Sequence, residues 1–309
     1  MHEHLAPFVY YLEVHLLYAS ILCLAAWAIT SIRGTSATWK YWIWVVTSCN
    51  FIVPLGGFFD RFGASTLAWA TQLRGLDAIG VGLSHRPGVA LAVAGVWLCG
   101  TAMMLGRLLL RLKADRHDAR AGSSSRSPCQ LPTLDVPVRF SGTVQSPSVS
   151  GFVHPSISLP DGIDHLLSKR ELDAVLMHEV THARRRDNLI GLMQELVLCG
   201  LWFHPLAWLT AFRLALYREL SCDDSVIANG QGAYLVRALA KLALPEAPSL
   251  LQARASSFMS LRVARLAASQ PEARCFAANS LLAVLFAALL LACILGTVAH
   301  TAHCFVIRT

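Results

Sequence analysis

The sequence has few charged residues for its length. Only 15% of its 309 residues are Asp, Glu, Lys or Arg, whereas 55% are hydrophobic and the mean hydropathy is +0.50. Because an average soluble domain is about 25% charged, this composition argues against a purely soluble globular protein. The formal net charge of +7 does not indicate direct binding of nucleic acid, since many of the basic residues flank apolar runs instead of gathering on one folded face.

The sequence also lacks the cysteine pattern of a disulfide framework or of a cysteine-based zinc site. Its nine cysteines are scattered, contain no Cys-x-x-Cys pair, and several of them lie inside apolar runs. The N-terminus has neither a basic segment nor a small-residue cleavage site after the first apolar run. We therefore expect this run to be retained as a membrane span and not removed as a signal peptide.

Four apolar stretches are long enough to cross a hydrocarbon core about 30 Å thick. They are residues 8–30, 41–59, 88–110 and 277–298. Ten Lys and Arg residues flank these spans on one side and four on the other, so the positive-inside bias predicts that both termini lie outside and that the long segment between the third and fourth spans is cytoplasmic. No internal repeat of the kind found in transporters is evident.

The predicted organisation has five parts. They are a three-helix transmembrane region (1–110), a basic flexible tether (111–133), a cytoplasmic domain (134–276), a fourth transmembrane helix (277–298) and a short outer tail (299–309). The tether is predicted from its richness in Ser, Arg and Gly.

Two short strands are predicted at the start of the cytoplasmic domain, near residues 136–144 and 151–159. There, β-branched residues alternate with polar ones between Gly and Pro. Pro155 cannot donate to a sheet ladder, which predicts that the second strand lies at an edge. Farther along the domain, residues 233–244 and 257–267 have the pattern of helices, the first of them amphipathic.

Between these strands and helices, a further predicted helix carries the chemistry. Ser168 and Glu171 match a capping box, which begins a helix with an apolar stripe. The helix contains the pattern His-Glu-x-x-His at 178–182, and one turn of helix places His178 and His182 on the same face, where both imidazoles can bind one zinc ion. Glu179 flanks the same site, as the general base of a metalloprotease does. The alternative, surface His and Glu on an amphipathic helix, stays open at this point.

A catalytic zinc site needs a third protein ligand. Glu219 and Asp223 are spaced four residues apart on a second predicted helical face, so Glu219 could ligate the metal and Asp223 could accept a hydrogen bond from a ligating histidine. Pairing of Glu219 with a neighbouring arginine, and simple surface polarity for Asp223, are the alternatives.

Residues 189–216 form a largely apolar stretch that hydropathy alone assigns to a fifth span. A straight helix from His182 to Glu219 would separate the two side chains by about 55 Å, which one metal ion cannot bridge. The chain must therefore reverse near residues 203–205, where Pro205 cannot continue an existing helix. His204 at this reversal is a candidate ligand or a donor to the transition-state oxyanion, and a turn-capping role is the alternative.

Other polar residues near these motifs are assigned simpler roles. Asp187 follows the arginine run 184–186 and is expected to make local salt bridges, while the run itself is expected to be a solvated face. Cys222 has no second cysteine nearby and is expected to be a buried thiol. His154 is expected on the surface.

Taken in order, the spans, the SPSVSGFVHPSISLP segment, HEVTH, WFHPLAW and ELSCDD resemble the BlaR/MecR-type family of integral-membrane zinc metallopeptidases, which transduce β-lactam signals. The chain more distantly resembles the prenyl-protein (CAAX) proteases and the heat-shock membrane proteases. The β-lactam transducers carry a penicillin-binding-like sensor domain after the fourth span. We expect no such domain here, because few residues follow that span.

The resemblance implies a mostly α membrane protein, in which a cytoplasmic α+β, gluzincin-like metalloprotease domain is inserted between transmembrane helices 3 and 4. It implies one Zn²⁺ per chain, held by His178, His182 and Glu219, with Glu179 as general base and Asp223 as a supporting carboxylate. The protein would be a multi-pass component of the bacterial inner membrane.

The implied activity is cleavage of a cytoplasmic protein, in such systems a DNA-binding repressor and sometimes the protease itself. A quality-control protease for membrane proteins and a non-proteolytic signalling scaffold with a structural zinc are the alternatives. Apart from this substrate and the lipid bilayer, the sequence names no partner, and it leaves homo-oligomer formation open.

Overall fold

The computed structural model describes residues 5–32, 35–52, 87–121, 136–242, 250–268 and 282–293. Its elements are α1 (Leu5–Thr30), α2 (Ala37–Ile52), α5 (Pro87–Ala121), β1 (Val138–Ser141), β2 (Ser148–Ser150), β3 (Ser156–Pro160), α6 (Ile163–Leu166), α7 (Lys169–Arg185), α8 (Asp187–Gly200), α9 (Pro205–Ala228), α10 (Gly232–Leu242) and α11 (Leu250–Ala267). A further apolar helix spans Leu282–Cys293. The protein is mostly helical and contains a small mixed sheet, as predicted.

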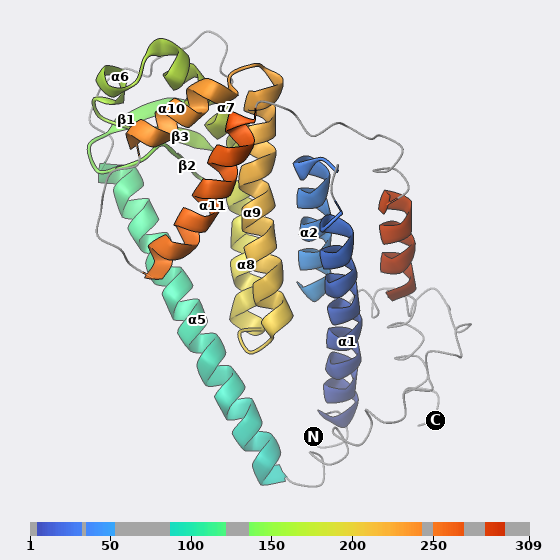
Figure 1. Ribbon diagram of the computed structural model, residues 1–309. Helices are drawn as coiled ribbons and strands as arrows, with labels where there is room; N and C mark the ends of the chain where they lie inside the picture. Colours follow the sequence, from blue (N-terminus) through green and yellow to red (C-terminus); the bar gives the residue numbers. More distant parts are fainter. Residues whose placement is uncertain are drawn as a thin grey trace.

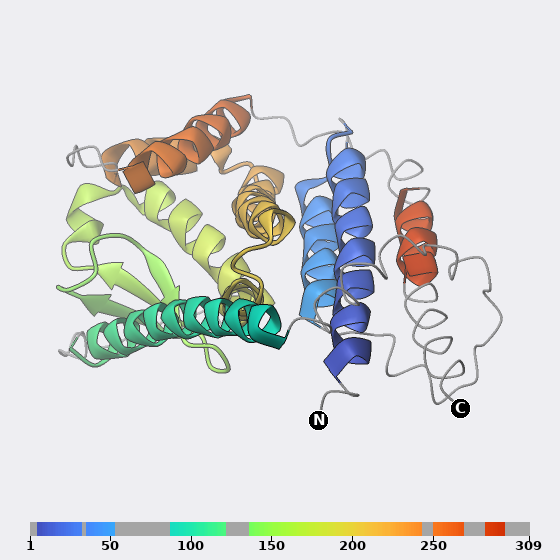
Figure 2. The ribbon, with the colours of Figure 1, turned by 90° about the horizontal axis from the view of Figure 1, so that it is seen from below.

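The α8–α9 hairpin lies between two groups of elements. The pair α1 and α2 packs on one side of it, and α5, α7 and the sheet lie on the other (Figure 2). Buried apolar residues of the first group and the hairpin, among them Leu22, Trp44 and Leu214, form one continuous core. The sheet, α6, α7 and α10 gather at one end of the long helices (Figure 1).

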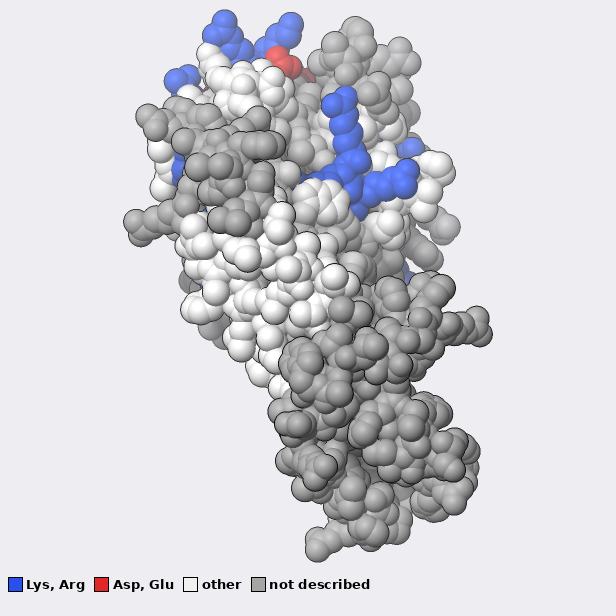
Figure 3. Space-filling model, turned by 90° about the vertical axis from the view of Figure 1, so that its right-hand side faces the viewer, with Lys and Arg blue, Asp and Glu red and all other residues white. Residues whose placement is uncertain are grey.

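Among the described residues, α5 contains the one helical segment that is long and apolar enough to cross a membrane, Leu91–Ala114. Only 11% of its most apolar window is buried, and Leu91 and Val96 are 74% and 63% exposed. Side chains this apolar favour hydrocarbon over water as their surroundings. On the face in Figure 3, Lys and Arg gather at the end that carries the sheet, and uncharged residues cover the described surface below them.

The other three predicted spans are not established by this criterion. The residues His15–Thr30 of α1 and the helix Leu282–Cys293 are apolar but shorter, and α2 ends at Ile52. Parts of the predicted spans, namely residues 53–59, 277–281 and 294–298, lie outside the described residues. Four transmembrane helices therefore stay a prediction.

α5 extends beyond the predicted third span as far as Ala121. This differs from the flexible tether predicted for residues 111–133. Residues 111–121 consist largely of Ala, Arg, Leu and Lys, which are good helix formers, so the helix continues past the apolar segment. Residues 122–133 of the predicted tether lie outside the described residues.

The predicted reversal of the chain before α9 is confirmed. α8 ends at Gly200, and α9 begins with Pro205 in its first turn, where the missing N–H of proline costs no helical hydrogen bond. His204 is the N-cap residue of α9. The hairpin returns the chain towards α7, as a metal site shared by the two helices requires.

The sheet has the order β1-β3-β2, with β1 parallel and β2 antiparallel to β3. The prediction that the strand after Pro155 lies at an edge is wrong, because β3 is the central strand. Pro155 comes one residue before the first strand residue, Ser156, so its missing N–H falls outside the ladder. The edge strands are β1 and β2, and β2 was not predicted.

α7 begins as its sequence predicts. The Ser168 side chain accepts a hydrogen bond from the N–H of Glu171, and the Glu171 carboxylate accepts one from the N–H of Ser168. The apolar face of α7, which includes Val175, is buried against Ile157 of the sheet and Leu235 of α10. Burial of such side chains contributes about 1.5–3 kcal/mol each, and it holds the remaining face of α7 towards α9.

Candidate metal centre

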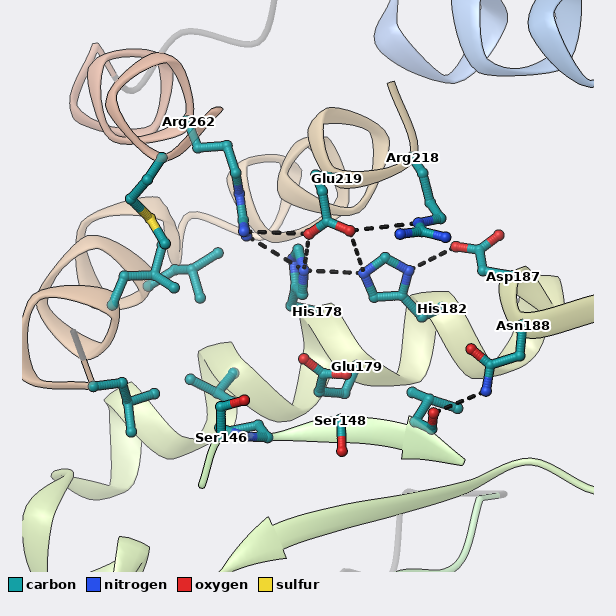
Figure 4. Close-up of a pocket in the computed structure, with 17 residues that line it drawn as sticks. Ser146, Ser148, His178, Glu179, His182, Asp187, Asn188, Arg218, Glu219 and Arg262 are labelled. Carbon is teal, nitrogen blue, oxygen red and sulfur yellow. Dashed lines mark hydrogen bonds and ion pairs between the residues drawn. The ribbon is translucent and has the colours of Figure 1, made fainter. Parts of the chain in front are cut away.

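Three side chains with metal-binding atoms converge between α7 and α9. Nε2 of His178 lies 3.1 Å from Nε2 of His182. The Glu219 carboxylate of α9 places one oxygen 3.5 Å from the first nitrogen and the other 3.7 Å from the second. Figure 4 shows the two imidazole rings and this carboxylate pointing towards one another. His178 is only 5% exposed, so the alternative of surface histidines is wrong for this helix.

These separations fit a shared zinc ion. Two ligand atoms bound to one tetrahedral zinc ion at about 2.0–2.1 Å lie about 3.3 Å apart. The N–N and N–O separations between His178, His182 and Glu219 are close to that value without rearrangement. Two imidazoles and one carboxylate also form a known ligand set of catalytic zinc.

Glu219 also contacts two arginines. Pairing with an arginine was the alternative role predicted for this residue. Nη1 of Arg262 lies 3.2 Å from one carboxylate oxygen, and Nε of Arg218 lies 3.5 Å from the other. Both contacts hold the carboxylate at the site, so an ion pair and a metal-ligand position are compatible here.

Asp223 contacts His178 at Nδ1, the ring nitrogen opposite the one that faces the other proposed ligands. This nitrogen lies 3.1 Å from Oδ1 of Asp223, a residue with no exposed surface. Arg262 of α11 in turn donates from Nε and Nη2 to the two oxygens of Asp223, at 2.8 and 2.9 Å. Such a forked pair fixes both the position and the plane of the carboxylate. Asp223 therefore lies where the sequence placed it, and Arg262 was not predicted.

His182 is held in the same way by Asp187. Its Nδ1 lies 2.6 Å from Oδ2 of Asp187, and Arg185 donates from Nε and Nη2 to the two oxygens of that carboxylate at 2.7 and 2.6 Å. Asp187 does make the local salt bridge that was predicted, but it also orients an imidazole, which was not. Of the predicted solvated run 184–186, Arg185 is mostly buried, with a side chain only 11% exposed.

A left-handed turn explains why no sequence pattern predicted that Asp187 orients His182. On an unbroken helix, a residue five positions after His182 would lie about 140° away around the axis. Arg186 instead adopts φ 56° and ψ 45° and ends α7, so that Asp187 begins a new helix and faces back towards His182.

The carboxylates make this a site that favours positive charge. Burial lowers the pKa of His178, but Asp223 and Glu219 more than compensate and raise it to about 9. Burial likewise opposes ionisation of Glu219 and Asp187, yet the neighbouring His178 holds the pKa of Glu219 well below its usual range, and His182 and Arg185 hold that of Asp187 at about 2. A dication is attracted by the same field.

Glu179 lies between these side chains and β2, on the wall of an open cavity of about 440 Å³ (Figure 4). The cavity is also lined by Ser146 and Ser148 on the sheet side and by Arg262 on the α11 side. Burial raises the pKa of Glu179, the direction that suits a carboxylate which must accept and return a proton.

His204 is not part of this site, which corrects its assignment as a catalytic residue or ligand. Its Nε2 lies 3.3 Å from Oγ of Ser20 in α1, and its ring packs edge-on against Phe51 of α2. Fifteen residues of α9 separate it from Glu219, which is about 22 Å along a helix. His204 therefore belongs to the contact between the hairpin and α1–α2.

A second group of potential ligands, His182, Asp187 and Cys222, also has donor atoms within 4.8 Å of one another. Arg185 donates to both Asp187 and Cys222, so its guanidinium already supplies the positive charge at this position. Cys222 is fully buried, as predicted for a structural thiol, and burial raises its pKa. His154 is exposed, as predicted.

Comparison with known proteins places this geometry in a family. A family model for the BlaR1 peptidase M56 matches residues 77–235. The chain is 29% identical over 147 residues to the regulatory protein BlaR1 of Bacillus licheniformis, covering 44% of this chain and 24% of that protein. It is 21% identical over 163 residues to the methicillin resistance mecR1 protein of Staphylococcus aureus, covering 48% of this chain and 27% of that protein. No solved structure matches significantly.

The converging His and Glu side chains form the kind of site that a metallopeptidase needs. The chain belongs to the BlaR1 peptidase M56 family, which confirms the resemblance found in the sequence. Its match spans about a quarter of the length of the curated relatives.

Proposed function

We propose that this protein is a membrane-embedded zinc endopeptidase of the gluzincin type that cleaves a cytoplasmic protein. One zinc ion per chain would be held by His178, His182 and Glu219. The observation that carries this proposal is the convergence of these three side chains at the wall of an open cavity that also contains Glu179. Structural zinc sites are closed by four protein ligands, so an adjoining cavity favours a peptidase over a scaffold with structural zinc.

Each residue of the site has one task in this reaction. Bound zinc supplies Lewis acidity, which polarises the scissile carbonyl and lets water lose a proton near neutral pH. Glu179 accepts that proton and returns it to the leaving amine. Asp223 and Asp187 keep the Nε2 atoms of the two imidazoles directed at the proposed ion position, because the Asp223 carboxylate lies 3.1 Å from Nδ1 of His178 and the Asp187 carboxylate lies 2.6 Å from Nδ1 of His182.

The substrate would lie extended along β2. β3 cannot pair with such a peptide, because its two sides are paired with β1 and β2. β2 is an edge strand, and its first residues, Ser148 and Val149, line the cavity together with Ser146 and Pro147 just before them. Asn188 of α8 donates to the carbonyls of Val149 and Gly151 and so anchors the other end of this edge. An extended peptide can pair with such an edge.

The substitution Glu179→Gln tests the proposal. It keeps the size and polarity of the side chain but removes its ability to accept a proton. We expect detergent-purified Glu179→Gln protein to bind zinc as the wild type does, and its turnover of a protein substrate to fall by about 10²–10⁴-fold. Asp173→Asn, on the same helix but outside the cavity, is the matched control and should retain activity. Normal proteolysis by the Glu179→Gln variant would show that Glu179 is not the general base.

The relatives support a role in signalling, since their names describe a regulatory protein and a methicillin resistance protein. We propose a DNA-binding repressor as the substrate class, with the chain itself as a second substrate. A quality-control protease is the alternative. Proteomes of cells with wild-type protein and with Glu179→Gln separate the two, because one or two stabilised proteins indicate a dedicated substrate and many indicate quality control.

The proposed location is the bacterial inner membrane, with the peptidase domain in the cytoplasm and both termini outside. The contacts of α2 support placing the metal centre near the inner end of the spans. The first residues of α2 contact the part of α9 that follows Glu219, through Thr38 and Ser221 at 2.8 Å and through the N–H of Ala37 and Asp224 at 3.3 Å. The connection between α1 and α2 therefore lies on the same side as the site.

A further inference from the structure

One face of α2 is hydrogen-bonded to the hairpin and to the residues around the metal centre. Along this face, Thr38 contacts Ser221, Tyr41 donates to Asp187 and Ser48 donates to Gln194. These positions recur every three to seven residues, which places them on one side of a helix. A predicted membrane span thus has a polar seam towards the peptidase elements, and Tyr41 is its member nearest to a proposed ligand.

The hydroxyl of Tyr41 completes the surroundings of Asp187. It donates to Oδ1 at 2.7 Å, while Arg185 donates to both oxygens and His182 lies 2.6 Å from Oδ2. A carboxylate accepts about four hydrogen bonds, so Asp187 has all of its partners. The Arg185 guanidinium also lies 4.0 Å from the centre of the Tyr41 ring. Tyr41 is completely buried, and Asp187 is 2% exposed.

We infer that Tyr41 is a positioning residue for the metal ligand His182. By fixing Asp187, the hydroxyl on α2 fixes the ring plane and the tautomer of His182, and therefore the direction of its Nε2. The inference rests on the proposed zinc site and adds a control point that lies outside the peptidase domain. A displacement of α2 against α8 changes this hydrogen bond.

The other imidazole provides an internal comparison. His178 is held by Asp223 and Arg262, and Arg262 comes from α11. Among the residues that the structure describes, no hydrogen bond joins this second carboxylate to α2. Within that part of the chain, the two histidines of the site therefore depend on different elements, and of the two only His182 is linked to α2.

The test is the zinc affinity of the full-length protein in detergent, measured by competition with a chromophoric chelator. Loss of a residue that orients a ligand directly lowers metal affinity by about 10–100-fold, and we expect this for Asp187→Ala. For Tyr41→Phe, one step farther away, we expect a smaller loss, about 3–10-fold, because Asp187 keeps its arginine. In the Asp187→Ala background, Tyr41→Phe should add less than about twofold, since the path to His182 is already broken.

Tyr217→Phe is the matched control. The Tyr217 hydroxyl is also buried and donates to the carbonyl of Thr30 in α1 at 3.1 Å, but it does not contact Asp187. The Tyr217→Phe variant should bind zinc with an affinity within about twofold of that of the wild type. Equal effects of Tyr41→Phe and Tyr217→Phe would overturn the inference, as would additivity with Asp187→Ala. If the Asp187→Ala protein does not accumulate, the inference is tested by comparing the zinc affinities of Tyr41→Phe and Tyr217→Phe.

The outcome separates this inference from the proposed function. A wild-type protein that binds no zinc refutes the metal site itself. A wild-type protein that binds zinc and cleaves its substrate, with Tyr41→Phe indistinguishable from Tyr217→Phe, refutes only the role of Tyr41. With zinc saturating, Tyr41→Phe should lower kcat and leave KM within about twofold, because Tyr41 does not line the cavity.

Discussion

Each proposed ligand histidine is held by a buried aspartate, and each aspartate is held by an arginine. Asp223 and Asp187 would be costly to bury as isolated charges, but the forked contacts of Arg262 and Arg185 neutralise them. The carboxylates can then direct the imidazoles without adding two uncompensated charges to the protein interior. Removing either arginine leaves a buried carboxylate without its main partner, which is costly in the protein interior.

We predict that ionisation of Glu171, at the start of α7, makes the stability of the folded protein depend on pH. Its carboxylate accepts from Lys241 at 2.7 Å and from the N–H of Ser168 at 2.8 Å, and these contacts hold its pKa at about 2, against an ordinary value of 4.5. Because the folded-state pKa is depressed, the stabilisation is complete above pH 4.5 and is lost as the pH falls towards 2.

Thermal unfolding of the wild type and of Glu171→Gln in detergent measures this effect. The wild type should unfold at a higher temperature at pH 6, and the difference should shrink steadily below pH 4.5. Glu195→Gln is the control, because the ion pair that Glu195 forms with Arg111 is exposed to solvent and contributes little to stability. A difference between wild type and Glu171→Gln that is the same at pH 6 and pH 3 would contradict the assignment.

At the scale of elements, local patterns predicted what local forces determine. The capping box and apolar stripe placed α7, and Pro205 placed the start of α9. The order of strands could not be read in the same way, because Pro155 constrains one N–H and says nothing about which strands flank β3. Asp187 was missed as an orienting residue because its role depends on the left-handed turn at Arg186.

Long-range contacts explain the remaining differences between sequence and structure. The spacing of Glu219 from the His-Glu-x-x-His pattern required a reversal of the chain, and this logic located the hairpin. It could not give the direction in which His204 faces, which is set by packing against α1 and α2. Arg262 lies 39 residues from Asp223 and Tyr41 lies 146 residues from Asp187, and no local pattern marks either residue.

The anchoring of β2 by α8 gives a prediction about substrate binding. Asn188→Ala removes two hydrogen bonds to the β2 edge, at 2.8 and 3.2 Å, without touching a proposed ligand. These bonds, each worth about 0.5–1.5 kcal/mol, hold the strand edge that the substrate would pair with, so their loss should raise KM for an extended peptide severalfold and leave kcat and zinc content little changed. Asn229→Ala, which loses one bond to the Ser225 carbonyl away from the cavity, is the control. An unchanged KM would contradict binding along β2.

At the scale of the whole molecule, a peptidase site is built against a layer of apolar helices. The hairpin of α8 and α9 carries Asp187 and Glu219 at its base and packs between α1–α2 and α5 (Figure 2). Hydropathy alone would assign part of this hairpin to a membrane crossing, whereas the metal geometry requires both of its ends on one side. The layer of apolar helices and the metal centre therefore share elements and are not separate modules.

X-ray absorption at the zinc edge of the full-length, detergent-purified protein tests the central claim most directly. The account predicts one zinc ion per chain, with only nitrogen and oxygen neighbours at about 2.0–2.1 Å and outer scattering from two imidazoles. Glu219→Gln should weaken or abolish this binding, whereas Glu179→Gln should not. A sulfur neighbour at about 2.3 Å, which would indicate Cys222, or the absence of stoichiometric zinc would contradict the account.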